Sequence, residues 1–229
     1  MPDCACTAFP FFDQPSLKSQ FQTQLNFPEA WIAISNSPLI DKKESINNRS
    51  VFVFDETEVI STYLYSFVAG KFKSIEKKYD DRVITMYHRE DDIKKLEINT
   101  DKIFDLHYSS LRWLEEYTQI NYPFTKFDFV IIPSFQYSGM EHPGAILYRD
   151  SRLFLEKNAT IREELNRANV IAHETAHMWF GDLVTMEWFS EVWLKEVFAN
   201  FIAGKIVNPQ YPEVNHELNF LINHYLLQI

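Results

Sequence analysis

Short apolar runs with a period of two residues dominate the first third of the chain. Leu17, Phe21, Leu25 and Phe27 fall on alternating positions, with polar residues among them, until Pro28 interrupts the run. Alternation of this kind places apolar side chains on one face of a strand. We therefore expect antiparallel β structure in this region, with strands near residues 17–27, 32–34, 51–54, 63–68 and 83–87.

The pattern changes after the charged residues 88–95, which we interpret as an exposed connection or boundary. Apolar residues between 103 and 117 recur at helical spacing, and Asn-Tyr-Pro at 121–123 should end that helix. Shorter apolar runs are typical of strands, and they occur at residues 127–132, 145–148 and 153–155. The second region should therefore mix sheet with helix.

Two longer helices are predicted further along. Thr160 and Glu163 match the capping-box pattern that opens a helix, and Gly181 is well placed to end it. Ser190 can cap the next helix, which the Asn-Pro pair at 208–209 should terminate. Both segments carry apolar residues at helical spacing, so we expect the two helices to face each other. Another helix-like run continues to the end of the chain.

The first of these two helices carries the sequence His-Glu-Thr-Ala-His at residues 173–177. Each residue of an α-helix advances about 100°, so positions i and i+4 lie roughly 40° apart and both imidazoles face one point. Glu196 can reach that point from the second helix. Zn²⁺ binds neutral imidazole and carboxylate, and three protein ligands leave a fourth position open, which is typical of catalytic zinc. We therefore predict one Zn²⁺ ion per chain, bound by His173, His177 and Glu196.

Glu174 lies between the two histidines but is rotated away from them, beside the predicted metal. From there it can accept a proton from a water molecule at the open position, so we assign it as the general base. The alternative is that the pentapeptide arose by chance in a buried helix, where the histidines are ordinary hydrogen-bonded core residues. Glu196 argues against that alternative, because it stands where a third ligand is needed.

Composition restricts the class of protein. With 229 residues, 46% of them hydrophobic and 16% aromatic, the chain can form one large or two modest domains. The formal net charge of −10 argues against a nucleic-acid partner, which would require a basic face. The sequence contains no Gly-rich phosphate loop, and no apolar run reaches the roughly 18 residues that a transmembrane helix needs.

Other features leave the cellular setting open. Cys4 and Cys6 do not indicate a disulfide, because residues two apart in an extended segment are spaced too widely. The chain shows no export signal of its own, so the compartment is undetermined, cytoplasmic or exported, and so is the oligomeric state. Because the sequence stops at Ile229 inside an apolar run, we expect a fragment with apolar surface exposed around residues 220–229.

Three blocks of residues together resemble the aminopeptidase N family of zinc metallopeptidases, the gluzincin group that also contains the leukotriene hydrolases. Residues 173–185 with Glu196 match its zinc-binding block. Gly-Met-Glu-His-Pro-Gly-Ala at 139–145 is similar to its G-x-M-E-N exopeptidase signature. Phe-Pro-Phe-Phe-Asp-Gln-Pro at 9–15 is similar to a P-x-F-D-x-P turn in its N-terminal β domain. The blocks occur in the expected order across nearly the whole chain.

The resemblance implies an α+β fold with an antiparallel β N-terminal part. Residues 1–90 would be the C-terminal part of a β-rich N-terminal domain, and residues 91–229 a thermolysin-like α/β zinc-peptidase domain truncated at its C-terminal end. The activity implied is zinc-dependent release of N-terminal amino acids from peptides with a free N-terminus. A tyrosine that stabilises the oxyanion would lie beyond residue 229, so we expect this chain to bind zinc but to be poorly active.

The resemblance also implies substrate-binding residues. Glu141 would bind the free α-amino group of the peptide, because a buried carboxylate is the natural partner of an ammonium ion. Gly139 and Met140 would offer backbone groups to the substrate, since a residue without a side chain permits close approach. His142 replaces the usual asparagine, and we interpret it as a hydrogen-bonding substitute and not as a further metal ligand.

Two other functions stay open. An endopeptidase would use the same zinc chemistry, although Glu141 disfavours it by blocking an extended substrate on the amino side. A catalytically silent zinc-binding fragment would keep the metal site but would not turn over a substrate. Cleavage of a peptide with a blocked N-terminus would favour the first, and zinc binding without turnover the second.

Overall fold

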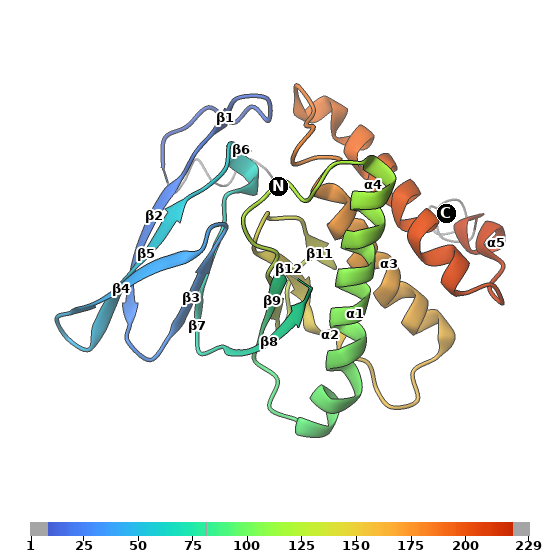
Figure 1. The fold of residues 1–229 in the computed structure, drawn as a ribbon, viewed down its shortest axis with the longest axis horizontal. Helices are drawn as coiled ribbons and strands as arrows, with labels where there is room; N and C mark the ends of the chain where they lie inside the picture. Colours follow the sequence, from blue (N-terminus) through green and yellow to red (C-terminus); the bar gives the residue numbers. More distant parts are fainter. Residues whose placement is uncertain (1–8, 81, 222–229) are drawn as a thin grey trace.

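The computed structural model describes residues 9–80 and 82–221, and it confirms the predicted α+β fold. The antiparallel strands of the first third lie on one side of the molecule and the helices on the other, with a five-stranded mixed sheet between them (Figure 1). Cys4, Cys6 and most of the apolar segment 220–229 lie outside the described residues, so the expectations for them stay untested.

Three small antiparallel sheets form the first third of the chain, as the alternation predicts. In the first sheet, β1 (Lys18–Ser19) pairs with β6 (Ile60–Ser61). In the second, β5 (Arg49–Glu56) lies between β2 (Gln22–Pro28) and β4 (Leu39–Ser45). In the third, β3 (Ile32–Ser35) pairs with β7 (Phe67–Gly70). In β5, Ser50, Phe52 and Phe54 are buried while the residues between them are less so. The two phenylalanines pack with Ala33 into a small core of their own.

Two strands that the alternation does not predict are rich in charged residues. β4 and β8 (Lys73–Tyr79) each lie at the edge of a sheet, and β4 is almost entirely exposed. Lysine side chains on an edge strand hinder its pairing with another molecule. Because such a strand contains few apolar residues, it lacks the apolar alternation by which the other strands are predicted. The strand predicted at 63–68 is only partly present, because its first residues form a 3-10 turn, η2 (Thr62–Leu64).

The five-stranded sheet has the order β11-β12-β10-β9-β8. Its members besides β8 are β9 (Arg82–His88), β10 (Phe129–Ile132), β11 (Gly139–Met140) and β12 (Ile146–Arg149). β10 pairs in parallel with both β9 and β12, and α1 (Ile93–Thr118) makes the crossover that the parallel neighbours β9 and β10 require. The sheet combines strands from both sides of residue 90, and the domain division at that residue stays a prediction.

α1 begins earlier than its apolar pattern predicts, at Ile93. Asp92 is the N-cap, and its carboxylate accepts hydrogen bonds from the backbone NH groups of Lys94 and Lys95. The charged stretch is therefore partly the first turn of the helix, which corrects its interpretation as a connection. The helix ends at Thr118, shortly before the predicted stop, and the next residue, Gln119, turns the chain away with a φ of 57°.

The other helical elements follow the five-stranded sheet. They are α2 (Asp150–Leu153), α3 (Ile161–His177), η3 (Phe189–Glu191), α4 (Val192–Val207), η4 (Asn208–Gln210) and α5 (His216–Leu221). The capping box is confirmed, since Thr160 and Glu163 exchange hydrogen bonds between side chain and backbone. Ser190 does not cap α4, because it lies in η3 and Glu191 takes the N-cap position without a side-chain hydrogen bond. None of the described helices is long and apolar enough to cross a membrane.

The prediction of a strand at residues 153–155 is wrong. α2 makes a single helical turn there, closed by a hydrogen bond from the NH of Phe154 to the carbonyl oxygen of Asp150. Leu153 and Phe154 are buried, so the segment is as apolar as a strand would be. A short apolar run cannot distinguish a buried turn from a strand.

The main core lies between the five-stranded sheet and the helices, and His107 is enclosed in it. His107 on α1 is fully buried, with Nδ1 2.8 Å from the carbonyl oxygen of Ile103 and Nε2 3.1 Å from the Tyr148 hydroxyl. Its ring stacks on that of Phe129, with 4.0 Å between the ring centres. Burial, opposed in part by the hydrogen bond to Ile103, lowers the pKa of His107 to about 3. The folded state therefore contains a neutral imidazole.

We predict that His107 makes the fold sensitive to acid. The unfolded chain protonates this histidine below about pH 6.5, whereas the folded chain keeps it neutral. The contribution of His107 to the free energy of unfolding is therefore complete above that pH and is lost as the pH falls toward 3. Between about pH 7 and pH 5 the loss should be about 2 kcal/mol. Urea unfolding of the wild type and of His107→Gln at both pH values measures it. An equally steep loss in the variant would contradict the prediction.

Candidate functional site

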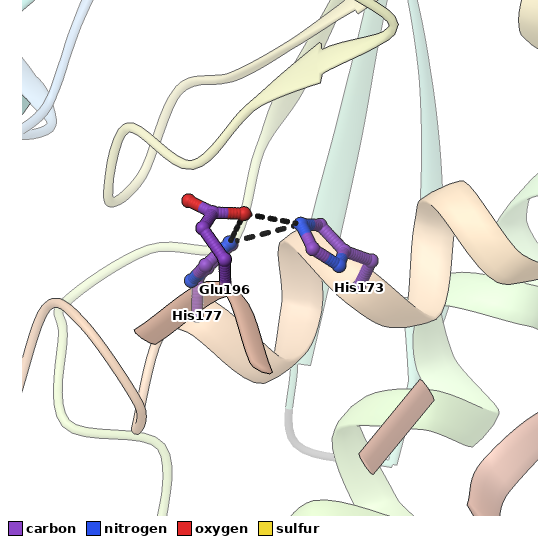
Figure 2. A group of neighbouring side chains, drawn as sticks. All are labelled: His173, His177 and Glu196. Atoms are coloured by element: carbon purple, nitrogen blue, oxygen red, sulfur yellow. Dashed lines mark hydrogen bonds and ion pairs between the residues drawn. The ribbon is translucent and has the colours of Figure 1, made fainter. Parts of the chain in front are cut away.

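α3 and α4 bring the three predicted metal ligands together (Figure 2). His173 and His177 lie one turn apart on α3, and Glu196 reaches them from α4. The Nε2 atoms of the two histidines are 3.0 Å apart, and Oε2 of Glu196 lies 3.4 Å from Nε2 of His173 and 3.7 Å from Nε2 of His177. The three ligand atoms thus converge on one point.

These atoms fit a tetrahedral zinc ion. Such an ion, roughly 2.1 Å from each ligand atom, requires separations of roughly 3.4 Å between the ligand atoms. The observed separations of 3.0, 3.4 and 3.7 Å lie on both sides of that value. Two imidazoles and one carboxylate also form the donor set of many catalytic zinc sites. The side chain of His177 is buried, whereas that of Glu196 is partly exposed.

The orientation of His177 depends on the chain that follows α3. Its Nδ1 lies 3.1 Å from the carbonyl oxygen of Phe180, so Nδ1 can donate its proton there and Nε2 keeps its lone pair for a metal. Gly181 permits this arrangement, because its φ of 144° disfavours a side chain and an added Cβ would lie 3.2 Å from Nδ1 of His177. The chain can therefore turn closely past the imidazole.

Glu174 is buried beside the predicted metal ligands, against β11. A Cβ added to Gly139 would come within 2.3 Å of Oε1 of Glu174, so the missing side chain of Gly139 makes room for this carboxyl group. Burial is the largest cause that raises the pKa of Glu174 to about 8, while His173 opposes the rise and Glu141 adds to it. A carboxylate in this environment accepts a proton readily.

Glu141 is also buried, and it is paired with Lys195. The Lys195 ammonium donates a hydrogen bond to Oε1 of Glu141. Burial alone would raise the pKa of Glu141, but the electrostatic effects of His177 and of the paired Lys195 outweigh it and lower the pKa to about 2. His142 follows in the chain, with Nδ1 2.9 Å from the carbonyl oxygen of Leu64. That contact agrees with a hydrogen-bonding role for His142.

A second set of possible metal ligands shares one histidine with the first. Carboxylate oxygens of Glu141 and Glu174 and a ring nitrogen of His177 also lie within 4.8 Å of one another. Glu141 already forms an ion pair with Lys195, and this set offers a single imidazole. The set with two histidines is therefore the better candidate for zinc.

Most of the chain matches the domains of one known peptidase family. The chain matches the peptidase family M1 domain over residues 103–228 and the peptidase M1 N-terminal domain over residues 2–64. The chain belongs to peptidase family M1. The histidine pair, Glu196 and the Gly-Met-Glu segment all lie within the first match. M1 members are zinc-dependent metalloaminopeptidases, which agrees with the resemblance that the motifs carry.

Curated M1 relatives cover much of this chain. They include endoplasmic reticulum aminopeptidase 1 of Mus musculus (37% identical over 221 residues), aminopeptidase N of Streptomyces lividans (37% over 205 residues) and leucyl aminopeptidase of Saccharolobus solfataricus (32% over 214 residues). These matches cover 94%, 88% and 93% of the chain. They cover only 23%, 23% and 27% of the relatives, so the chain spans about a quarter of their length.

Lys195 is a residue of this M1 site that the motifs do not reveal. It directly precedes Glu196, and its ammonium lies 3.4 Å from Oε1 of Glu196 in addition to its contact with Glu141. The signal in the sequence is a lysine on the same face of α4 as Ala199 and Ile202, which are buried. A lysine at a position that normally takes an apolar residue indicates a buried partner of opposite charge.

We predict that Gly139→Ala displaces Glu174 and lowers the free energy of unfolding of this M1 chain. The expected loss is about 1–3 kcal/mol, as for other overpacked positions. Gly204→Ala on α4 is the matched control, since its Cβ would meet nothing closer than Nδ2 of Asn208 at 3.6 Å and alanine favours a helix. Urea unfolding compares the two variants. Equal stability would show that Gly139 has room for a methyl group.

Proposed function

We propose that this M1 chain carries the metal-binding and general-base residues of an aminopeptidase that removes N-terminal amino acids from peptides. The observation that carries the proposal is the convergence of His173, His177 and Glu196 beside the buried carboxyl group of Glu174. One Zn²⁺ ion per chain would be held by these three ligands. The three relatives named above are aminopeptidases, which supports the same reaction.

The residues around the metal site suit peptide hydrolysis. When bound, zinc would supply Lewis acidity toward the scissile carbonyl group and would make a water molecule more acidic. Glu174 would accept the proton of the attacking water at its carboxylate and return it to the leaving amino group. Gly139 supports that role, because it admits the Glu174 side chain against β11 and so restricts where the carboxylate can lie.

Glu141 supports an exopeptidase over an endopeptidase. Its carboxylate is buried, and its lowered pKa keeps it charged at neutral pH. A charge-assisted hydrogen bond would bind the ammonium group of a free N-terminus there. A peptide that continued on the amino side would instead place a neutral amide against a buried charge, which is unfavourable. The expected substrate is therefore a peptide with an unblocked N-terminus.

β11 supports binding of the peptide backbone. Gly139 and Met140 form the outer strand of the five-stranded sheet, where β12 is the only strand beside them among the residues that the structure describes. The free edge of an outer strand offers backbone donors and acceptors to an extended peptide. The substrate would lie along this edge next to Glu174, with its amino end at Glu141.

The ligand assignment predicts stoichiometric zinc binding. After exhaustive dialysis, metal analysis should find one zinc ion per chain in the wild type and none in His177→Ala, which lacks one of three ligands. His216→Ala is the control, because His216 on α5 contacts the backbone of Tyr211 and should not affect the metal. Full zinc content in His177→Ala would reject the ligand set.

In any active version of this protein, Glu174→Gln should keep zinc but lose turnover, because the amide preserves the shape of the side chain and cannot accept the proton. The expected loss is about 10²–10⁴-fold. Hydrolysis of an aminoacyl arylamide measures it, with Glu116→Gln on the exposed face of α1 as the control. A loss below about tenfold would place the general base elsewhere.

The same assay separates the two rival functions. A wild-type chain that binds zinc and hydrolyses neither free nor blocked substrates would be a catalytically silent zinc-binding protein. Cleavage of a peptide with a blocked N-terminus at a rate equal to that of the free peptide would favour an endopeptidase. Preference for the free N-terminus, lost in Glu141→Gln, is the outcome that the proposed function requires.

A further inference from the structure

The side chain of Lys195 lies on the buried face of α4. Only 9% of the residue is exposed, and it shares that face with Ala199, Ile202 and Ala203. Its aliphatic stem runs past Gly181, where an added Cβ would lie 3.3 Å from Cδ of Lys195. Burying an ammonium ion is unfavourable unless the ion is paired. The groups around the ammonium must therefore account for this lysine.

Two carboxylates and an aromatic ring surround the ammonium group. Lys195 donates a hydrogen bond to Glu141, its Nζ lies 3.4 Å from Oε1 of Glu196, and the centre of the Tyr63 ring is 4.9 Å away. Carboxylates and an aromatic face are the groups with which proteins recognise ammonium ions. The surroundings would suit an ammonium group of the protein and one of a ligand equally well.

We propose that Lys195 occupies the amine-binding position at Glu141, and that the amino group of a peptide must displace it in order to bind. The two groups are chemically alike and require the same carboxylate oxygens. Two ammonium ions about 4 Å apart repel each other in a buried site, so Glu141 does not hold both well. Lys195 is thus a positioning residue that weakens the binding of free N-termini. This inference rests on the proposed role of Glu141.

The length of the lysine side chain allows the displacement. Its four-carbon stem is flexible and its ammonium can turn toward several acceptors. Oε1 of Glu196 is already within 3.4 Å of Nζ and offers a second partner once Glu141 binds the substrate. The chain can therefore admit a substrate amine without leaving Lys195 buried and unpaired.

Calorimetry on the zinc-loaded chain tests the displacement. The probes are leucinamide, which has a free amino group, and N-acetyl-leucinamide, which has none. If Lys195 holds Glu141 in about nine of ten molecules, Lys195→Gln should bind leucinamide about tenfold more tightly than the wild type, with no gain for the acetylated probe. Lys195→Arg keeps the cation and should resemble the wild type. Lys126→Gln removes another buried lysine, 3.2 Å from Asp128, and should change neither affinity.

Other results overturn separate parts of the argument. If Lys195→Gln binds leucinamide no more tightly than the wild type, while both still prefer it to the acetylated probe, the displacement is wrong and Glu141 remains the amine site. If no variant distinguishes the two probes, Glu141 does not bind the amine, and the proposed exopeptidase function fails together with the displacement.

Lysine NMR provides a second test that leaves the charge of Lys195 in place. In wild-type protein labelled at the ε-carbon of lysine, the signal that Lys195→Arg lacks belongs to Lys195. Leucinamide should shift that signal by releasing the ammonium from Glu141, and the acetylated probe should not. An unshifted signal at saturating leucinamide overturns the displacement, whether or not Lys195→Gln folds.

Discussion

The crowding of four acidic side chains in a largely buried space is the constraint on which the site depends. The carboxyl groups of Glu141, Glu174 and Asp182 are buried and that of Glu196 is partly covered, and the field of one raises the pKa of another. Like charges are tolerated in such a space only when cations or hydrogen bonds balance them. Lys195 supplies one such cation, and an ion held by His173, His177 and Glu196 would supply another. The geometry of the site and its chemistry therefore follow from one electrostatic condition.

Features with a local cause are predictable from the sequence. The capping box of Thr160 and Glu163 involves only a few neighbouring residues, and two histidines at i and i+4 share a helix face wherever that helix lies. The approach of Glu196 requires in addition that two helices pack face to face, and the apolar pattern of both segments predicts that packing. The chemical roles of these residues are proposals that rest on this geometry.

Features that depend on distant neighbours are not predictable in this way. β4 and β8 are strands because β5 and β9 offer them hydrogen bonds, although their own side chains are charged and largely exposed. Lysine is usually a surface residue, and only the packing of α4 directs Lys195 to Glu141, 54 residues earlier in the chain. The place of Lys195 among apolar residues of α4 indicates a buried partner of opposite charge, but it does not indicate which residue that partner is.

Two of the candidate ligands lie on α3 and the third lies on α4, which affects how these two helices assemble. His173 and His177 are correctly spaced as soon as α3 forms, whereas Glu196 arrives only when α4 docks. An ion held by all three would act as a cross-link between the helices. Closing the intervening loop costs conformational entropy, and the free energy of ion binding would offset it. Metal uptake and the docking of α4 would then be a single cooperative step, and a chelator would loosen the helices as well as remove the ion.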